Sequence, residues 1–360
     1  MGANFLIAAA TVILQSPPDT AARPSPSQSA DTVTHGGFAF ERPSDLFQYN
    51  RVQGVSVGVG YRVPLPGPFT ATYATLRYGV SDDRVTGRLS VVYDAPGWRL
   101  AVSGYHDVAD VDPFSPGRGF SNTFDALFAG HDNGDYVLAG GGSVVLETSV
   151  GTRLDLRLGA RLERQSGLRA VAESAVNDFL GGTGIFPPNW PVREGTFGIG
   201  WVRLTGQGRL RWNLTVDVLG GAGQVKPRLF GDIRWHAGWR RGITVQLKAG
   251  AGPEPALPQT LFRLGGVNTV RGFEYGSVRG PAFWAGQVDL APLGGRVRPV
   301  IFLDAGQAGA ISDLVTSTAL VGGGVGLSLL KGLLRFDLSR ALSPDSNRKL
   351  RFDIVIQGVR

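Results

Sequence analysis

The residues with the clearest chemical potential lie in one glycine-rich stretch late in the chain, residues 262–273, with the sequence FRLGGVNTVRGF. Its Arg271 is a permanent cation whose planar set of donors suits a carboxylate partner, and Gly272 permits a sharp turn that aims this side chain. The stretch lies within a long segment, 253–280, and connections of that length usually have a function. We therefore predict a structural contact centred on Arg271; the alternative is an unpaired, solvated loop arginine.

Other residues that often do chemistry have spacings that fit no catalytic or metal site. The chain has four histidines without metal-ligand spacing, His35, His106, His131 and His236. The glycine runs 140–142 and 322–324 do not lead into a G-K-[ST] sequence, and they fit strand positions that face a close neighbour. Residues 132–135, DNGD, lack the remaining EF-hand spacing and predict a turn. With no nucleophile and base pair in the sequence, we expect no enzyme activity, metal or cofactor.

Composition favours an all-β chain and argues against several classes of protein. The 360 residues include 53 Gly, one Met and no Cys, a glycine content that suits strands, bulges and tight turns better than helices. The absence of Cys excludes a disulfide framework and thiolate metal sites. The formal charge of +7 comes mostly from single arginines at alternate strand positions, not from a phosphate-tracking patch, so we expect no nucleic-acid partner.

Alternation of apolar and polar residues predicts strands with one face toward an apolar environment and the other toward an aqueous one. In residues 153–163 every second residue is Leu or Ala, and nearly all the others are charged. The same pattern returns at 209–218 and 350–357. These strands match the roughly nine to eleven tilted residues that cross a bilayer, where only a closed barrel pairs every backbone group. No run of apolar residues is long enough for a spanning helix.

Glycine, proline and aspartate turns divide the chain into about sixteen such strands. The predicted strands are 36–44, 53–64, 69–80, 84–95, 97–108, 134–148, 151–165, 193–206, 208–222, 225–239, 241–252, 281–292, 296–308, 318–330, 331–341 and 348–359. Bacterial barrels have an even strand number, short periplasmic turns and longer outer loops. Counted from a periplasmic start, the long connections 109–133, 166–192 and 253–280 all fall on the outer side. The sequence therefore predicts a transmembrane antiparallel β-barrel.

The glycine-rich stretch resembles the signature of the bacterial surface antigen (BamA/TamA-like) family, a Leu-Gly-Gly followed by (V)RG(F/Y) in the sixth outer loop. The matching residues here are Gly265, Gly266, Arg271, Gly272 and Phe273. Residues 299–306, PVIFLDAG, are similar to the family's F-x-D-x-G segment on strand thirteen. The two motifs in this order are far more specific than RGF alone. The resemblance implies that the long outer loop folds back into the barrel lumen.

The resemblance also implies partners for the loop arginine. In the family an acidic residue on strand thirteen holds it, often with a second acid on strand twelve, and by motif position these roles fall to Asp304 and Asp289. An arginine in a low-dielectric lumen must be paired, and a carboxylate accepts its two donors together. Gly306 leaves room for the loop backbone against the barrel wall.

The front of the chain departs from the family. Residues 5–14 and the Pro/Ser-rich stretch that follows are similar to an export signal and a flexible leader, although basic residues before the apolar core are missing. The alternative is a disordered tail. We assign 1–35 to this leader and 36–360 to the barrel, an arrangement without the periplasmic POTRA domains that bind clients in the family. The last residue, Arg360, also differs from the aromatic residue typical of such barrels.

For function, the resemblance implies a protein of the bacterial outer membrane that takes part in the insertion or translocation of proteins, or of lipids. Its expected partners are outer-membrane lipid and either client outer-membrane or secreted polypeptides or a separate periplasmic protein. A short or irregular first strand would suit the weak seam between first and last strands on which this activity depends. The alternative is a passive structural barrel or pore, in which the arginine contact only plugs and braces the lumen.

Overall fold

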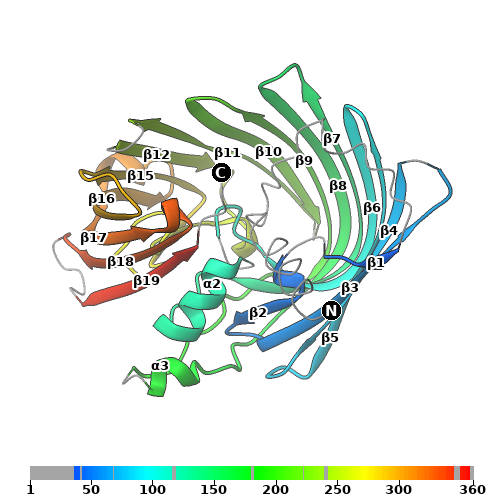
Figure 1. The fold of residues 1–360 in the computed structure, drawn as a ribbon, viewed down its shortest axis with the longest axis horizontal. Coiled ribbons are helices and arrows are strands. Elements are labelled where there is room, and N and C mark those ends of the chain that lie inside the picture. Colours follow the sequence, from blue (N-terminus) through cyan, green and yellow to red (C-terminus); the bar gives the residue numbers. More distant parts are fainter. Residues whose placement is uncertain are drawn as a thin grey trace.

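In the computed structural model of the protein, one large antiparallel sheet curls into a barrel (Figure 1). The residues described are 36–40, 43–67, 69–115, 119–179, 182–221, 223–238, 242–343 and 349–356. The predicted leader, residues 1–35, and the terminal Arg360 lie outside them.

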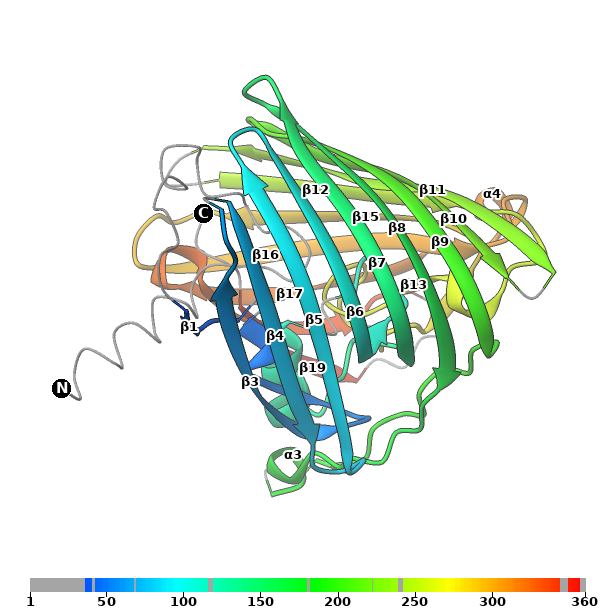
Figure 2. The ribbon, with the colours of Figure 1, turned by 90° about the vertical axis from the view of Figure 1, so that its right-hand side faces the viewer.

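Seventeen strands make up the sheet. They are β1 (Gly37–Phe38), β2 (Phe47–Asn50), β3 (Gly54–Pro64), β4 (Thr70–Gly79), β5 (Arg84–Ala95), β6 (Trp98–Asp110), β7 (Tyr136–Val150), β8 (Leu154–Gly167), β9 (Gly195–Gly206), β10 (Leu210–Gly221), β11 (Gln224–Ala237), β12 (Gly242–Ala251), β15 (Ala282–Ala291), β16 (Val297–Gly309), β17 (Leu320–Leu329), β18 (Leu334–Ala341) and β19 (Leu350–Ile356). From β2 onward each pairs antiparallel with the next, and β12 pairs with β15. Figure 2 shows the long strands tilted side by side. The predicted all-β antiparallel barrel of about sixteen strands is confirmed.

The first strand is shorter and more irregular than the predicted 36–44, so that prediction was wrong. Of the described residues in that range, only the two of β1 form a strand, and they pair with β3. The 3-10 turn η1 (Pro43–Asp45) follows. The chain rejoins the sheet as β2, whose four residues pair with the beginning of β3. The physical reason is that Pro43 has no N–H to donate to a ladder and is tolerated only at sheet edges or outside strands.

The two faces of the sheet differ in polarity as the alternation predicts. On β10, Val216 is 45% exposed on the outside, whereas its neighbours Thr215 and Asp217 are 3% and 7% exposed on the inside. The same contrast separates Leu162 from Glu163 on β8. An apolar belt of exposed side chains around a polar interior is the distribution that a surrounding bilayer requires.

Helical turns occupy the connections. They are η1, α2 (Phe120–Phe124), η2 (Asp125–Ala129), α3 (Ala175–Phe179), η3 (Pro258–Thr260), α4 (Asp313–Thr316) and η4 (Leu330–Gly332). None of the helices in the described ranges has the length and apolar character needed to span a membrane.

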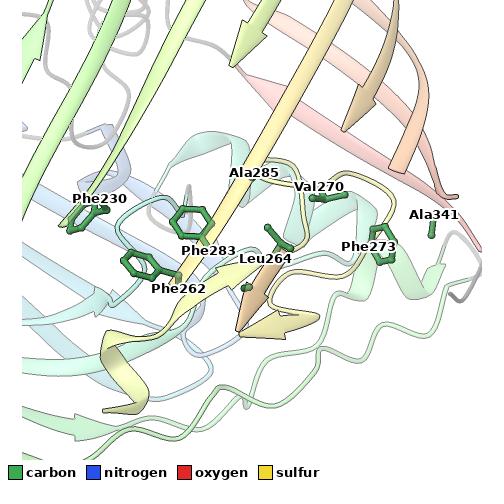
Figure 3. Close-up of a cluster of buried hydrophobic side chains, with 9 residues drawn as sticks. Phe230, Phe262, Leu264, Val270, Phe273, Phe283, Ala285 and Ala341 are labelled. Carbon is green, nitrogen blue, oxygen red and sulfur yellow. The ribbon is translucent and has the colours of Figure 1, made fainter. Parts of the chain in front are cut away.

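The long connection after β12 folds into the barrel and forms its hydrophobic core. Within it, β13 (Phe262–Leu264) and β14 (Val278–Gly280) pair as a small two-stranded sheet. Apolar side chains of this connection pack against side chains of the wall (Figure 3). The cluster comprises Phe230, Phe262, Leu264, Val270, Phe273, Phe283, Ala285, Ala308 and Ala341. Removing this surface from water holds the connection inside, as the predicted fold requires.

The outer belt generates a stability prediction. Val216→Arg places a charge on the apolar face near the middle of β10, and we expect it to lower the free energy of unfolding by about 2–4 kcal/mol. Guanidinium titration in lipid vesicles, followed by tryptophan fluorescence, measures this change. Asn213→Arg is the matched control, because Asn213 lies on the inner face, where it donates to Asp232 over 2.9 Å. Equal effects of the two substitutions would contradict the assignment of the faces.

Candidate functional site

The backbone around Arg271 depends on glycines at the positions that the sequence motif marks. Gly265, Gly266 and Gly272 have φ angles of +109°, +81° and +89°, in the left-handed region that side chains disfavour. The Gly266 N–H donates to the carbonyl of Phe273 over 3.0 Å, which closes the intervening loop. Phe273 itself is buried in the hydrophobic cluster. This tight loop carries Arg271 to the barrel wall.

Arg271 makes a two-pronged contact with Asp304 of β16. Its Nε donates to Asp304 Oδ2 over 2.7 Å and its Nη2 to Asp304 Oδ1 over 2.6 Å. The backbone N–H of Arg271 adds a third bond to Asp304 Oδ2, 2.9 Å long. Both side chains are almost fully buried. Charge-assisted bonds in this planar geometry are among the strongest that side chains make.

Two further carboxylates approach the same guanidinium. Arg271 Nη2 donates to Asp289 Oδ1 of β15 over 2.9 Å, and Nη1 donates to Asp337 Oδ2 of β18 over 3.2 Å. The structure therefore brings together the three residues that the resemblance singles out, Arg271, Asp304 and Asp289, and adds Asp337. One loop side chain thus ties three strands of the wall to each other.

Sequence reasoning gave no role to Asp337 and Arg335, and it quoted Phe302 only as part of the F-x-D-x-G motif. Arg335 of β18 is a second cation in the cluster, with bonds of 2.6 Å to Asp289 Oδ2 and to Asp337 Oδ1. The ring of Phe302 lies against both guanidiniums. Its centroid is 3.7 Å from Arg271 Cζ and 5.4 Å from Arg335 Cζ. Alternation places all three side chains on the inner face, but it does not say which inner residues meet. We call Arg271, Arg335, Asp289, Asp304, Asp337 and Phe302 the lumen latch.

The charges of the lumen latch keep Arg271 ionised. Burial alone would lower the pKa of Arg271, but Asp304, Asp289 and Asp337 outweigh burial and raise the pKa above its ordinary value. Each of the three carboxylates contacts at least one of the two guanidiniums, and Asp289 and Asp337 contact both. Such a cluster can brace and position a loop.

Glycines on β17 make room for the lumen latch in the wall. Gly322, Gly324 and Gly326 occupy alternate inward positions between β16 and β18. A Cβ at Gly322 would collide with the Arg271 carbonyl, and one at Gly326 with Asp337. Gly306 of β16 plays a similar part, since a Cβ there would lie 2.9 Å from Leu264 Cδ1 and 2.8 Å from the Trp284 carbonyl.

A second buried ion cluster lies at the end of the barrel that carries the long connections. Asp135 accepts a 2.7 Å bond from Arg263 Nε and a 2.9 Å bond from Arg51 Nη2. Arg279 lies 3.7 Å from the same carboxylate and stacks over Trp190, with 3.9 Å between its Cζ and the ring centroid. Burial would raise the pKa of Asp135, but Arg263 and Arg51 lower it overall. Residues 132–135 were predicted as a plain turn, so this partner role was also missed.

Comparisons with known proteins bear on the fold. A scan against protein-family models finds no match, and no curated protein matches the sequence. Among solved structures, BamA from Haemophilus ducreyi lacking POTRA domains 1–3 is similar with a TM-score of 0.57. The two share 12% identity, over 86% of this chain and 68% of that one. The chain has the fold of a BamA-like barrel.

Two other solved barrels are more distant. CdiB from Acinetobacter baumannii gives a TM-score of 0.47 at 14% identity, over 83% of this chain and 56% of that chain. CdiB from Escherichia coli gives 0.44 at 14% identity, over 89% of this chain and 61% of that chain. This chain thus spans less than two thirds of either CdiB protein. At these identities the likeness concerns the fold alone.

The lumen latch generates a graded mutational prediction. Arg271→Ala leaves the buried carboxylate of Asp304 without its cation, and we expect it to cost about 3–5 kcal/mol of unfolding free energy. Arg271→Lys keeps the charge but loses the two-pronged geometry, so its cost should be intermediate. Arg99→Ala is the control, because Arg99 is a half-exposed inner arginine 3.8 Å from Glu147. If Arg271→Ala costs no more than Arg99→Ala in guanidinium titrations, the latch does not hold the loop.

The glycines of β17 give a second test. Gly322→Ala should displace the Arg271 backbone and cost about 1–3 kcal/mol, the usual range for overpacking. Gly323→Ala is the matched control, since a Cβ at Gly323 points the other way; its nearest neighbour is the flexible end of Leu342 at 3.0 Å, and the Phe302 carbonyl at 3.4 Å is at ordinary contact distance. The same unfolding titrations measure both. A larger loss for Gly323→Ala would contradict the close approach.

Proposed function

We propose that this chain is an outer-membrane barrel that assists the insertion or translocation of proteins, or of lipids, across the bacterial outer membrane. The proposal places its working part at the seam between the first and last strands. Its partners would be outer-membrane lipid and client polypeptides, with or without a separate periplasmic protein.

The observation that carries the proposal is the weakness of this seam. Within the described residues, β2 has four and β19 has seven, whereas β7 in the middle of the sheet has 15. The first strand is also interrupted between β1 and β2, as described above. A short edge forms few ladder hydrogen bonds, so opening the barrel there costs less than at any pair of long strands.

The position of the lumen latch also supports a barrel that is rigid in one part and weakly held at the seam. Arg271 of the inward-folded connection meets latch residues of the wall that lie on β15, β16 and β18, close to β19 but not on it. Ion pairs and the hydrophobic cluster stiffen this part of the barrel, while the edge strands beyond it have no share in the latch. A braced wall beside a weakly held edge is what opening at one defined place requires.

A passive structural barrel or pore is the second candidate. The observation that favours it is the hydrophobic cluster inside the barrel, because an apolar core around the inward-folded connection braces a barrel whether or not it handles clients. The two candidates differ in whether a client folds faster in their presence.

A reconstitution experiment distinguishes them. The refolded protein is placed in lipid vesicles, and an unfolded eight-stranded outer-membrane protein is added as client. We expect the client to fold several times faster than in control vesicles, which contain a folded eight-stranded barrel in place of this protein at the same protein-to-lipid ratio. The reason is that the weak seam offers a sheet edge on which the client can form its first strand. Heat-modifiable gel mobility measures the rate of folding. A rate equal to that of the control vesicles would contradict the proposal.

Single-channel recording gives the second readout for the same preparation. Small conductance that changes sharply in Arg271→Ala is expected of a barrel whose latched loop controls the lumen. A large, steady conductance indifferent to Arg271, with no client acceleration, would leave a passive pore.

A further inference from the structure

A helical segment from the connection after β6 lies between the first and last strands of the barrel. It comprises α2, η2 and the residues that follow, and we call residues 119–132 the seam wedge. Figure 1 shows α2 between β2 and β19, and both α2 and η2 contact both strands. Side chains of the seam wedge bond to the backbone of each edge.

On β19, two side chains of the seam wedge take the place of a neighbouring strand. Asp125 Oδ1 accepts the N–H of Ile354, and Ser121 Oγ donates to the Ile354 carbonyl over 3.1 Å. Ser121 Oγ also accepts the N–H of Ile356 over 3.2 Å. In an antiparallel strand, the N–H and C=O of one residue point to the same side and those of the next residue to the other. Ile354 and Ile356 therefore present the edge of β19 that faces away from β18.

On the other side, the seam wedge holds β2 and the turn after it. The N–H of Tyr49 donates to Thr123 Oγ1 over 3.2 Å, and the N–H of Arg51 donates to Asp132 Oδ2 over 2.6 Å. The end of the seam wedge also reaches back to β19, where His131 Nδ1 lies 3.1 Å from Asp353 Oδ1. The seam wedge thus satisfies backbone groups that an open sheet edge would otherwise leave unpaired.

We propose that the seam wedge is a removable stand-in for a strand, and that an extended polypeptide pairs with β19 at Ile354 and Ile356 only after the wedge leaves. This inference rests on the proposed function and deepens it. It names the docking edge, the chemistry of the partner and the segment that competes with it. The partner supplies free backbone N–H and C=O groups in an extended conformation, which β-strand addition requires of any sequence.

The contacts of the seam wedge suit a segment that can leave. Its polar hold on β19 consists of side-chain bonds to three backbone groups and the contact of His131 with Asp353, whereas a strand would form a continuous ladder. Its apolar contact on the β2 side comes from Ala126 and the partly buried Leu127, which pack in a cluster with Tyr49, Phe186 and Val55. Burial and the nearby carboxylate of Asp353 raise the pKa of Asp125, so ionised Asp125 is unfavourable in its seated position.

Hydrogen exchange tests the first half of the inference without any client. The variant Ser121→Ala/Asp125→Ala removes the stand-in bonds, and we expect the amides of Ile354 and Ile356 to exchange at least ten times faster than in the wild type. The amides of Asp353 and Val355 face β18 and serve as internal controls. Asp125→Asn keeps an acceptor for the Ile354 N–H and should retain protection there. Unchanged exchange at Ile354 and Ile356 in the double variant would overturn the inference.

A peptide capture experiment tests the second half. The probe is a synthetic peptide with the sequence of Leu334–Ala341, the natural partner of β19 on its opposite edge, carrying a photo-crosslinker. The locked form is His131→Cys/Asp353→Cys joined by a short bifunctional thiol reagent, which is clean because the chain has no cysteine. The unjoined double-cysteine protein controls for the substitutions.

We expect labelling of β19 to be strongest in Ser121→Ala/Asp125→Ala, weaker in the wild type and at least ten times lower in the locked form than in the double variant. Equal labelling of the locked form and the double variant, or no labelling of β19 in any form, would overturn the inference. Heat-modifiable mobility verifies that each variant is a folded barrel. No folding client is present in the capture experiment, so its result is independent of the client-folding assay. The capture result tests the seam wedge and the client-folding result tests the proposed function, so the failure of one is distinguishable from the failure of the other.

Discussion

The interior of this barrel depends on the pairing of Arg271 with three carboxylates of the wall. A guanidinium that leaves water needs matched charge and hydrogen bonds, because an unpaired ion in a dry interior is unstable by several kcal/mol. Asp304 supplies the two-pronged contact, and Asp289 and Asp337 complete it. The constraint explains why the wall beneath is faced with glycine and why the loop must turn sharply at Gly272.

The apolar cluster and the lumen latch divide the work of holding the inward-folded connection. Phe262, Leu264 and Val270 bury apolar surface and contribute attraction without direction. The ion pairs contribute less net attraction, since desolvation offsets much of it, but they specify one position of the loop on β16. Because Arg335 bonds to two of the same carboxylates, the latch also joins β15 to β18. Both contributions act on the carboxyl-terminal part of the barrel.

The seam at the amino-terminal edge is held by a few separate polar contacts instead of a buried ion cluster and an apolar core. β2 is short, and its outer edge meets a helical segment through Thr123 instead of a full ladder. Ser121 and Asp125 do the same for β19. Side-chain oxygens can satisfy backbone groups one at a time, but they do not reproduce the cooperativity of a ladder. The barrel thus combines a firmly braced wall with a seam that discrete polar contacts keep closed.

The sequence by itself determined most of the strands and their faces, because period-two alternation and glycine turns are local properties of the chain. The inward fold of the long loop was implied by the family resemblance of its motif. The motif also pointed to Arg271, Asp304 and Asp289. Only the tertiary structure decided that Arg335 and Asp337 join them, since strand register and tilt bring inner residues together across β17. The same holds for the interrupted first strand and for the seam wedge, 119–132. The contacts of the seam wedge with β19 join residues more than two hundred positions apart, such as Ser121 and Ile354, which no local pattern encodes.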